Sequence, residues 1–388
     1  MSEEKKFPDG FLWGASTASY QVEGGNENTD WAQAARAGRV PPAGIACDHY
    51  NRYEEDWDIA QILNFSSQRF SIEWARIEPE EGKFDEKEME HYRKVVKALR
   101  ARGMEPFVTI WHLTMPTWLS DKGGIAYKHW PELLARYGAY VAKHLGEDVK
   151  FYITINEPLV VTGIGYLAGT RPPFKRNPLA YFRAVSNVIR GHRKMYAAIK
   201  KAASHAKLGV SKNIVPMEGT NPIGSVFASL GSWWYNSRYL NKIKDRQDFI
   251  ALNHYFRIVF WQNKKQQQKY PKSDLGWELY PPSMYTSLML LKKYNVPVYI
   301  SEHGVADADD SRRLEFIRGT LKYVHQAIAD GVDVRGYSHW SLMDNFEWTE
   351  GFPPRFGLVE IDYENGRKRI IRESAKAYAE IIKQNAIS

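Results

Sequence analysis

Two short segments decide the fold: TINEP at residues 154–158 and ISEHG at residues 300–304. In each segment a glutamate, Glu157 or Glu302, follows residues that favour β-strands and comes just before a proline or glycine that turns the chain. A side chain in this place lies at the carboxyl end of a strand, where barrels of parallel strands present groups to a pocket. The two segments therefore predict parallel strands that each end in an acidic side chain.

The rest of the chain alternates between strand-like and helix-like runs. Eight runs are expected to be strands, at residues 12–15, 65–72, 106–112, 151–155, 207–210, 249–253, 298–302 and 334–341. Amphipathic runs at 85–102 and 130–146 are expected to be helices, with Asp85 and Glu88 as an N-terminal capping pair for the first. Strict alternation predicts a parallel sheet covered by helices, and eight repeats favour the closed (β/α)8 TIM barrel.

The length of 388 residues fits one such barrel, because closed α/β barrels reach this size as one unit. No internal repeat, low-complexity tract or linker divides the sequence, so residues 1–388 are predicted to form a single domain. Residues 213–245 are the least regular part, and a long loop plus a helix over the barrel mouth is expected there.

Composition predicts a soluble globular protein, with 44% hydrophobic and 25% charged residues. The single cysteine excludes an internal disulfide, and the first residues lack the apolar core of a secretion signal, so a cytoplasmic location is expected. No apolar run approaches the roughly 20 residues that cross a bilayer, and no membrane partner is expected.

The formal charge of +8 does not predict nucleic-acid binding, because lysine and arginine are scattered among acidic residues. Glycines 163, 165 and 169 lack the spacing of a dinucleotide-binding loop. Histidines occur singly rather than in metal-ligand sets. We therefore expect no metal and no cofactor.

Polar and aromatic residues gather at or just beyond the expected strand ends. They are Gln21, Arg69, His112, Asn156, Glu157, Tyr255, Glu302, Trp340, Glu347 and Trp348. Hydrogen-bonding side chains mixed with tryptophans suit a sugar, because hydroxyl groups need polar partners and the C–H faces of a pyranose pack on aromatic rings. A phosphate would instead call for a glycine-rich loop or an arginine cluster.

Several ordered motifs resemble glycoside hydrolase family 1, of the retaining β-glucosidase and β-galactosidase type. Besides TINEP and the glutamate-X-glycine of ISEHG, they are FLWGASTASYQVEG (11–24), RFSIEWARI (69–77), WELYP (277–281), WSLMDNFEW (340–348) and RFGL (355–358). The resemblance covers nearly the whole chain.

The resemblance implies a role for each candidate. Glu157 would be the general acid/base and Glu302 the nucleophile, with Arg69 and Tyr255 contacting and tuning Glu302. The substrate-binding set would be Gln21, His112, Asn156, Tyr255, Trp340, Glu347, Trp348 and Phe356, with Trp340 as the stacking floor and Trp277 as an aglycone platform.

A retaining mechanism needs two carboxyl groups about 5 to 5.5 Å apart, one to attack the anomeric carbon and one to protonate the leaving oxygen. The implied activity is hydrolysis of terminal non-reducing β-D-glucosides, with β-galactosides and β-fucosides as secondary substrates. Small oligosaccharides and aryl or alkyl β-glycosides are the expected partners. Two alternatives stay open: a 6-phospho-β-glycosidase and a catalytically impaired glycan-binding barrel.

Three positions depart from the family pattern. His303 stands where asparagine is usual, His254 where the first of two tyrosines is common, and Phe174 where glycine is common. The two histidines are expected to alter the surroundings of the nucleophile. The chain is also short for the family, which predicts trimmed loops at the barrel mouth.

Overall fold

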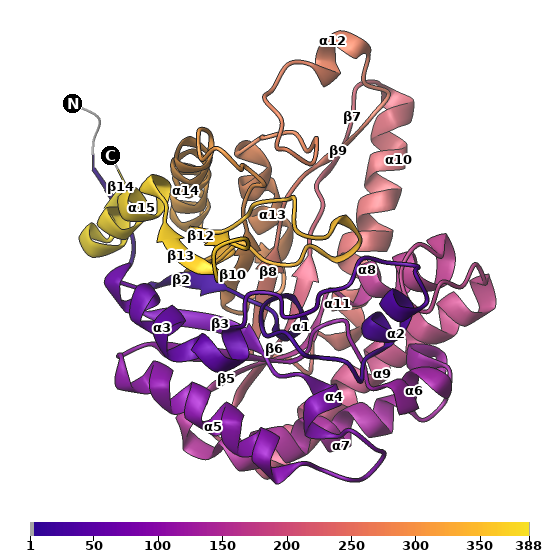
Figure 1. Ribbon diagram of the computed structural model, residues 1–388. Helices are drawn as coiled ribbons and strands as arrows, with labels where there is room; N and C mark the ends of the chain where they lie inside the picture. Colours follow the sequence, from indigo (N-terminus) through magenta and orange to yellow (C-terminus); the bar gives the residue numbers. More distant parts are fainter. Residues whose placement is uncertain (1–3, 388) are drawn as a thin grey trace.

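The computed structural model describes residues 4–387 (Figure 1). Its centre is a closed barrel of eight parallel strands, in the order β10, β11, β2, β3, β4, β5, β6 and β8. Their bounds are β2 Leu12–Ser16, β3 Ser67–Ser71, β4 Glu105–Trp111, β5 Phe151–Asn156, β6 Lys207–Asn213, β8 Phe249–Asn253, β10 Val298–His303 and β11 Val334–Trp340. The predicted (β/α)8 barrel is confirmed; that the whole chain is one domain stays a prediction.

Strand ends are where the expectations and the structure differ. β6 runs three residues beyond the expected end at Val210, because Ser211, Lys212 and Asn213 stay in register with Ala251, Leu252 and Asn253 of β8. Pairing between neighbours therefore determines where this strand ends, and local composition did not reveal it.

Helices cover the outside of the barrel (Figure 1). The larger ones are α3 His49–Ile62, α5 Glu86–Ala101, α7 Trp130–Leu145, α9 Pro178–Ala202, α10 Pro222–Ser232, α13 Pro282–Lys292, α14 Arg313–Ala329 and α15 Glu373–Gln384. Both helices expected from periodicity, now α5 and α7, are present. Asp85 caps α5 by accepting from the amides of Lys87 and Glu88 at 2.8 and 3.2 Å.

The other half of the predicted capping pair is wrong. The Glu88 carboxylate accepts from the Tyr50 hydroxyl at 3.1 Å, and the amide of Asp85 donates to the carbonyl of Ile77 instead. A tertiary partner has replaced the local one.

Shorter elements lie at the two ends of the barrel. Three two-stranded sheets pair β1 Lys5–Lys6 with β14 Ala386–Ile387, β7 Met217–Gly219 with β9 Ile258–Phe260, and β12 Val359–Asp362 with β13 Lys368–Ile371. The short α-helices are α1 Ser19–Val22, α2 Asp30–Arg36, α4 Trp74–Ile77, α6 Thr117–Asp121, α8 Pro158–Thr162, α11 Arg238–Ile243 and α12 Lys264–Gln267. Single turns of 3-10 or π type are η1 Gly124–Ala126, η2 Gly146–Asp148, η3 Gly163–Ala168, η4 Trp233–Ser237 and η5 Trp348–Glu350.

The irregular region 213–245 is more ordered than expected. In place of a long loop it holds β7, α10, the π-type turn η4 and α11. The expectation of one helix with a long loop was wrong, because β7 is held by pairing with β9, some forty residues further along the chain.

Aromatic side chains fill the amino-terminal end of the barrel. Phe107 and Phe151 stack with ring centroids 4.4 Å apart, and Phe249 and Tyr299 pack edge-on against them. All four are the first or second residue of a strand or lie close to its start. This plug leaves the carboxyl ends of the strands free to carry polar groups, as in other barrels of this kind.

Candidate active site

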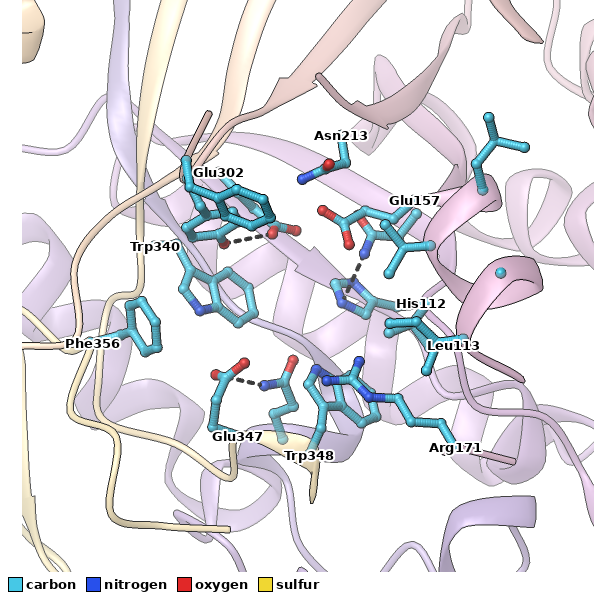
Figure 2. A pocket seen from close by; sticks show the side chains of 18 of the residues that line it. His112, Leu113, Glu157, Arg171, Asn213, Glu302, Trp340, Glu347, Trp348 and Phe356 are labelled. Atoms are coloured by element: carbon cyan, nitrogen blue, oxygen red, sulfur yellow. Dashed lines mark hydrogen bonds between the residues drawn. The ribbon is translucent and has the colours of Figure 1, made fainter. Parts of the chain in front are cut away.

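A pocket of about 370 Å³ lies at the carboxyl ends of the barrel strands (Figure 2). Its lining includes eleven predicted site residues: Gln21, His112, Asn156, Glu157, Tyr255, Trp277, Glu302, Trp340, Glu347, Trp348 and Phe356. The remaining one, Arg69, does not line the pocket but hydrogen-bonds Glu302. The structure thus brings the whole predicted set together, while the role of each residue stays a prediction.

Glu302 is the penultimate residue of β10 and lies among groups that stabilise a negative charge. The Arg69 guanidinium donates to its Oε1, and the Tyr255 hydroxyl donates to its Oε2 at 2.8 Å. Arg69 is only 1% exposed, so this ion pair is screened little by water. The chain can turn closely here because Gly304 has no Cβ, which would lie 1.8 Å from the carbonyl oxygen of Trp340.

Glu157 lies on the opposite side of the pocket in different surroundings. It has a left-handed backbone, with φ of 46°, and immediately precedes Pro158 at the start of α8. Its Oε1 accepts from the Asn253 side-chain amide at 3.0 Å. Burial, and then the negative charge of Glu302, raise the pKa of Glu157 to about 7. One carboxyl group is therefore held as an anion and the other can carry a proton near neutral pH.

A hydrogen-bond network fixes the side chains between the two glutamates. Asn156 accepts from Arg69 at 2.8 Å and from Asn253 at 3.2 Å through Oδ1, so its amide nitrogen faces His112 Nε2 at 3.2 Å. Nε2 is then the acceptor, which puts the His112 proton on Nδ1. Burial and the charge of Arg69 hold the pKa of His112 well below its usual range, so the ring is neutral. Within residues 4–387, Nδ1 has no hydrogen-bond partner and can donate to a ligand.

Gln21 and Glu347 form a second polar group in the pocket, and Figure 2 shows Glu347 near Trp348 and Phe356. The Gln21 amide nitrogen donates to the Phe346 carbonyl at 2.8 Å and to Glu347 Oε2 at 3.4 Å. Its carbonyl oxygen has no partner in the described part of the chain and can accept from a ligand. Burial raises the pKa of Glu347 to about 8, against the positive charge of Arg171, which lowers it.

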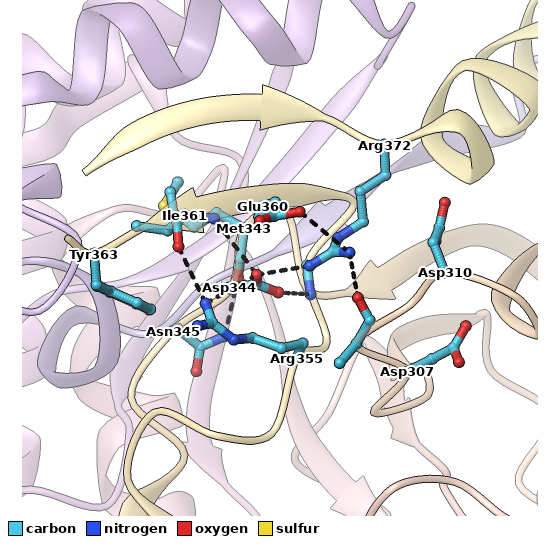
Figure 3. A network of polar contacts seen from close by, with 12 residues as sticks. Asp307, Asp310, Met343, Asp344, Asn345, Arg355, Glu360, Ile361, Tyr363 and Arg372 are labelled. Carbon is cyan, nitrogen blue, oxygen red and sulfur yellow. Dashed lines mark hydrogen bonds and ion pairs between the residues drawn. The ribbon is translucent and has the colours of Figure 1, made fainter. Parts of the chain in front are cut away.

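A buried ionic network anchors the loop that carries Glu347, Trp348 and Phe356 (Figure 3). Asp344 accepts from the Gly357 amide at 2.9 Å, from Arg372 at 2.9 Å and from Arg355 at 3.3 Å. The loop between β11 and β12 is thereby tied to itself and to the start of α15.

Some pocket residues were missed by sequence reasoning. The pocket is also lined by residues of α8 and η3 and by Asn213, Tyr235, Arg171, Leu113 and Phe256. Asn213 ends β6, and the rule that polar strand ends are functional would have found it had the strand been predicted at full length. Arg171 follows η3 in an irregular loop, where no local pattern marks it. Its guanidinium makes no hydrogen bond or ion pair with the residues that the structure describes.

The two unusual histidines point away from the pocket. His254 hydrogen-bonds the Ile214 carbonyl at 3.0 Å and the Ser283 hydroxyl at 2.7 Å, and His303 bonds the Tyr337 hydroxyl at 3.0 Å. The expectation that these histidines alter the surroundings of the nucleophile was wrong, because neither histidine side chain hydrogen-bonds Glu302 among the described residues. The backbone amide of His254 donates to the backbone carbonyl of Glu302.

Phe174, the third departure, has a φ of 56°. This is the left-handed region that favours glycine, which explains why glycine is common at the position. Here the Arg39 guanidinium lies 3.5 Å from the centroid of the Phe174 ring, and the contact holds the loop.

The family is shown by comparison with known proteins. The sequence profile described as Glycosyl hydrolase family 1 matches residues 3–226 and 234–387. The chain belongs to this family. It is 33% identical to beta-glucosidase A of Thermotoga maritima, with 99% of each chain covered, and 30% identical to a beta-galactosidase of Pyrococcus woesei, with 98% of each covered.

Solved structures of the family agree. A beta-glycosidase from Pyrococcus horikoshii superposes with a TM-score of 0.92 at 36% identity, covering 100% of this chain and 97% of that one. A family 1 glucosidase from Thermotoga maritima gives 0.92 at 32% identity with both chains covered at 100%. The alignment of this chain with beta-glucosidase A of Thermotoga maritima spans 442 positions. Because this chain has 388 residues, the relative contains residues that this chain lacks.

Across the described residues, no helix is long and apolar enough to cross a membrane. No cluster of three histidine, cysteine, aspartate or glutamate side chains suited to a metal occurs within 4–387.

Proposed function

We propose that this family 1 glycosidase releases single terminal β-D-glucosyl units, with retention, from small oligosaccharides and from aryl or alkyl β-glucosides, and acts on β-galactosides and β-fucosides more slowly. The observation that carries the proposal is the pair of glutamates in one pocket with opposite surroundings: an anion paired with Arg69 and a carboxyl group whose pKa is raised to about 7. Opposed environments assign opposed roles to a carboxyl pair.

The reaction then takes two steps. In the first, the Glu302 carboxylate attacks the anomeric carbon from the face opposite the leaving group while Glu157 gives its proton to the departing oxygen. In the second, the Glu157 carboxylate takes a proton from water, water attacks the same carbon, and Glu302 leaves as the carboxylate. Two inversions give net retention.

Other side chains in the pocket would bind the sugar. His112 Nδ1–H and the Gln21 carbonyl oxygen are a free donor and a free acceptor among the described residues, and Glu347 adds a carboxylate. Trp340 provides an aromatic floor for the C–H face of the ring. Tyr255, Trp277 and Phe356 pack together, with ring centroids 5.6 to 6.2 Å apart, as an apolar wall for the aglycone.

One observation favours a second candidate, a glycosidase for 6-phosphorylated sugars. Arg171 places a guanidinium without a hydrogen-bond partner among the described residues in the same pocket as Glu347. Glu347, which is charged above about pH 8, would repel a phosphate there, which is why the neutral glucoside is preferred. A panel of nitrophenyl β-glycosides with and without a 6-phosphate decides between them. A barrel that only binds glycans would cleave no member of the panel.

Glu302→Ala and Glu157→Gln test the two roles. Glu302→Ala should abolish turnover, and added azide should restore it with the α-glucosyl azide as product. Glu157→Gln should lose most activity on alkyl glucosides, because acid catalysis contributes roughly 10²- to 10⁴-fold, yet still cleave dinitrophenyl glucoside and accumulate a glycosyl-enzyme. Azide should release that intermediate as the β-azide. The exposed Glu350→Ala serves as control, and normal turnover in Glu302→Ala would refute the assignment.

The compartment is a separate part of the proposal. The single cysteine, Cys47, is buried and bonds the Asp344 carbonyl, so the described fold contains no disulfide that would call for an oxidising compartment. This supports the cytoplasmic location that the composition predicted. Fractionation of the source cells would test it.

A further inference from the structure

Helix α10 presents its apolar side chains to solvent instead of to the core. Large apolar residues recur at helical spacing along α10 and continue into η4 and the residue after β9, and all are more than half exposed: Ile223, Val226, Phe227, Leu230, Trp233 and Trp261. We refer to these six as the apolar face. Such spacing normally marks the stripe that a helix buries. Contiguous exposed apolar residues on this scale mark an interaction site.

The helix packs on the protein through its smallest residues. Gly224 and Ala228 are the buried residues of α10, and a Cβ on Gly219 of β7 would lie 2.1 Å from the backbone of Gly224. Figure 1 shows α10 on the outside of the barrel beside β7 and β9, with α12 beyond their ends. The small residues make the intramolecular contact, which leaves the large ones for another partner.

The surroundings of the apolar face are basic. The sequence between Glu218 and Asp245 contains no acidic residue and includes Arg238, whose guanidinium lies 4.1 Å from the centroid of the Trp234 ring. Residues 258–273 also lack acidic residues, and Lys265, Lys269 and Lys272 are exposed in them. The two segments are neighbours, because β7 pairs with β9 and the Phe227 and Trp261 rings lie 5.3 Å apart.

This combination selects one kind of partner. A second copy of the chain would bring two basic surfaces together, which charge repulsion opposes. An anionic lipid surface fits both features, because tryptophans and aliphatic side chains enter the interface while lysines meet the headgroups. The earlier expectation of no membrane partner rested on the lack of a run long enough to cross a bilayer, and a helix lying in the interface needs no such run.

The apolar face adjoins the pocket. Tyr235 of η4 follows Trp233 and Trp234 directly, and its hydroxyl donates to the Asn213 side chain at 3.0 Å. Tyr235 and Asn213 both line the pocket. We propose that α10, η4 and Trp261 dock this protein on the surface of an anionic lipid bilayer, with the pocket mouth beside the membrane.

Sedimentation with vesicles tests the proposal. The full chain should bind vesicles of phosphatidylcholine containing phosphatidylserine and shift its tryptophan emission to the blue, bind pure phosphatidylcholine less, and be released by high salt. Ile223→Ser combined with Phe227→Ser should reduce binding about tenfold or more while hydrolysis of soluble nitrophenyl glucoside stays unchanged. Lys265→Glu with Lys269→Glu should weaken binding roughly fivefold or more for each removed lysine.

The matched control is Ile62→Ser on α3, because Ile62 and Ile223 are both 65% exposed and α3 lies on another side of the barrel from α10 (Figure 1). Three outcomes would overturn the proposal. They are no binding to anionic vesicles at low salt, equal loss of binding in the control, and a dimer in ultracentrifugation that Ile223→Ser with Phe227→Ser dissociates. The dimer would show that the apolar face binds a second copy of the chain instead of a membrane. None of these readouts depends on which glycoside is hydrolysed.

Discussion

At the scale of residues, the two glutamates differ through their neighbours. Glu302 faces Arg69 and Tyr255, whereas Glu157 receives a single neutral hydrogen bond from Asn253. Because burial disfavours the charged form, Glu157 gains a proton at a pH where an exposed glutamate would have lost it.

Glu302→Gln should lower the pKa of Glu157. The negative charge of Glu302 is the second cause that holds this pKa at about 7, after burial, and the substitution removes it. Titration of the Glu157 carboxyl by isotope-edited infrared spectroscopy would measure the change. In the unmodified enzyme kcat/KM should fall as pH rises through about 7, since the general acid loses its proton there. Glu347→Gln is the control and should shift Glu157 less; an unmoved pKa in Glu302→Gln would contradict the argument.

Glu347→Ala should weaken recognition of the glycone. Loss of a buried hydrogen bond to a charged group costs about 1.5 to 3 kcal/mol, so kcat/KM should fall by roughly one to two decades at a pH above about 8, where Glu347 is charged. If Glu347 contacts O4, as the family resemblance implies, the ratio of rates for the glucoside and the galactoside should change. The ratio of kcat/KM values on the two nitrophenyl glycosides measures this, and an unchanged ratio would move Glu347 away from O4.

At the scale of elements, the loop from β11 to β12 depends on one buried carboxylate. Asp344 is fully buried and accepts hydrogen bonds from two arginines and from the Gly357 amide (Figure 3). Removing the Asp344 carboxylate would also leave the charges of the two arginines without a partner, and an uncompensated buried charge lowers the stability of the fold.

Asp344→Asn should therefore destabilise the protein by about 3 kcal/mol and raise KM, since Glu347 and Trp348 lose their anchored position. Asp333→Asn is the matched control: Asp333 also pairs with an arginine, Arg335, but both are about half exposed. Such surface pairs contribute about 0 to 1 kcal/mol. Urea unfolding and steady-state kinetics of the two variants supply the comparison. Similar losses in both would show that the anchor has no special weight.

At the scale of the whole molecule, buried titratable groups make stability depend on pH. The pKa values of Asp30, Glu73 and Glu157 are raised to about 7, each chiefly by burial. A raised carboxyl pKa stabilises the fold at low pH, and this contribution is lost as pH rises through about 7. Burial lowers the pKa of His192 and His254 to about 4, so their contribution is present above about pH 6.5 and lost on acidification. The two sets oppose each other between about pH 4.5 and 6.5, and only the carboxyl groups still titrate above this range, so stability should fall as pH rises from about 6.5 through 7.

Glu157→Gln should raise the melting temperature at pH 8 and leave it nearly unchanged at pH 5. The wild-type side chain must be charged at pH 8 in a site that disfavours charge, and the neutral amide avoids this cost of about 1 to 2 kcal/mol after allowance for water in the pocket. Calorimetry at both pH values measures the difference, with the exposed Glu380→Gln as control. An equal change in melting temperature at pH 5 and pH 8 would show that protonation of Glu157 is not coupled to folding.

Local sequence patterns determined the architecture and the two glutamates. Alternating periodicities of two and 3.6 residues specify strands and helices over a few positions, and a polar residue followed by proline or glycine marks a strand end. For this reason the eight strands, α5 and α7 and the positions of Glu157 and Glu302 could be predicted before any contact was known.

Tertiary structure alone decided what depends on partners distant in sequence. Arg69 meets Glu302 across 233 positions because the barrel closes. Arg171 reaches the pocket from an irregular loop, and Glu88 gives up its capping role for Tyr50. The spacing in α10 would indicate a buried stripe by periodicity alone. The large apolar side chains of α10 face outward because Gly224 and Ala228 make the contact with the rest of the protein. No local pattern specifies which side of a helix its neighbours will cover.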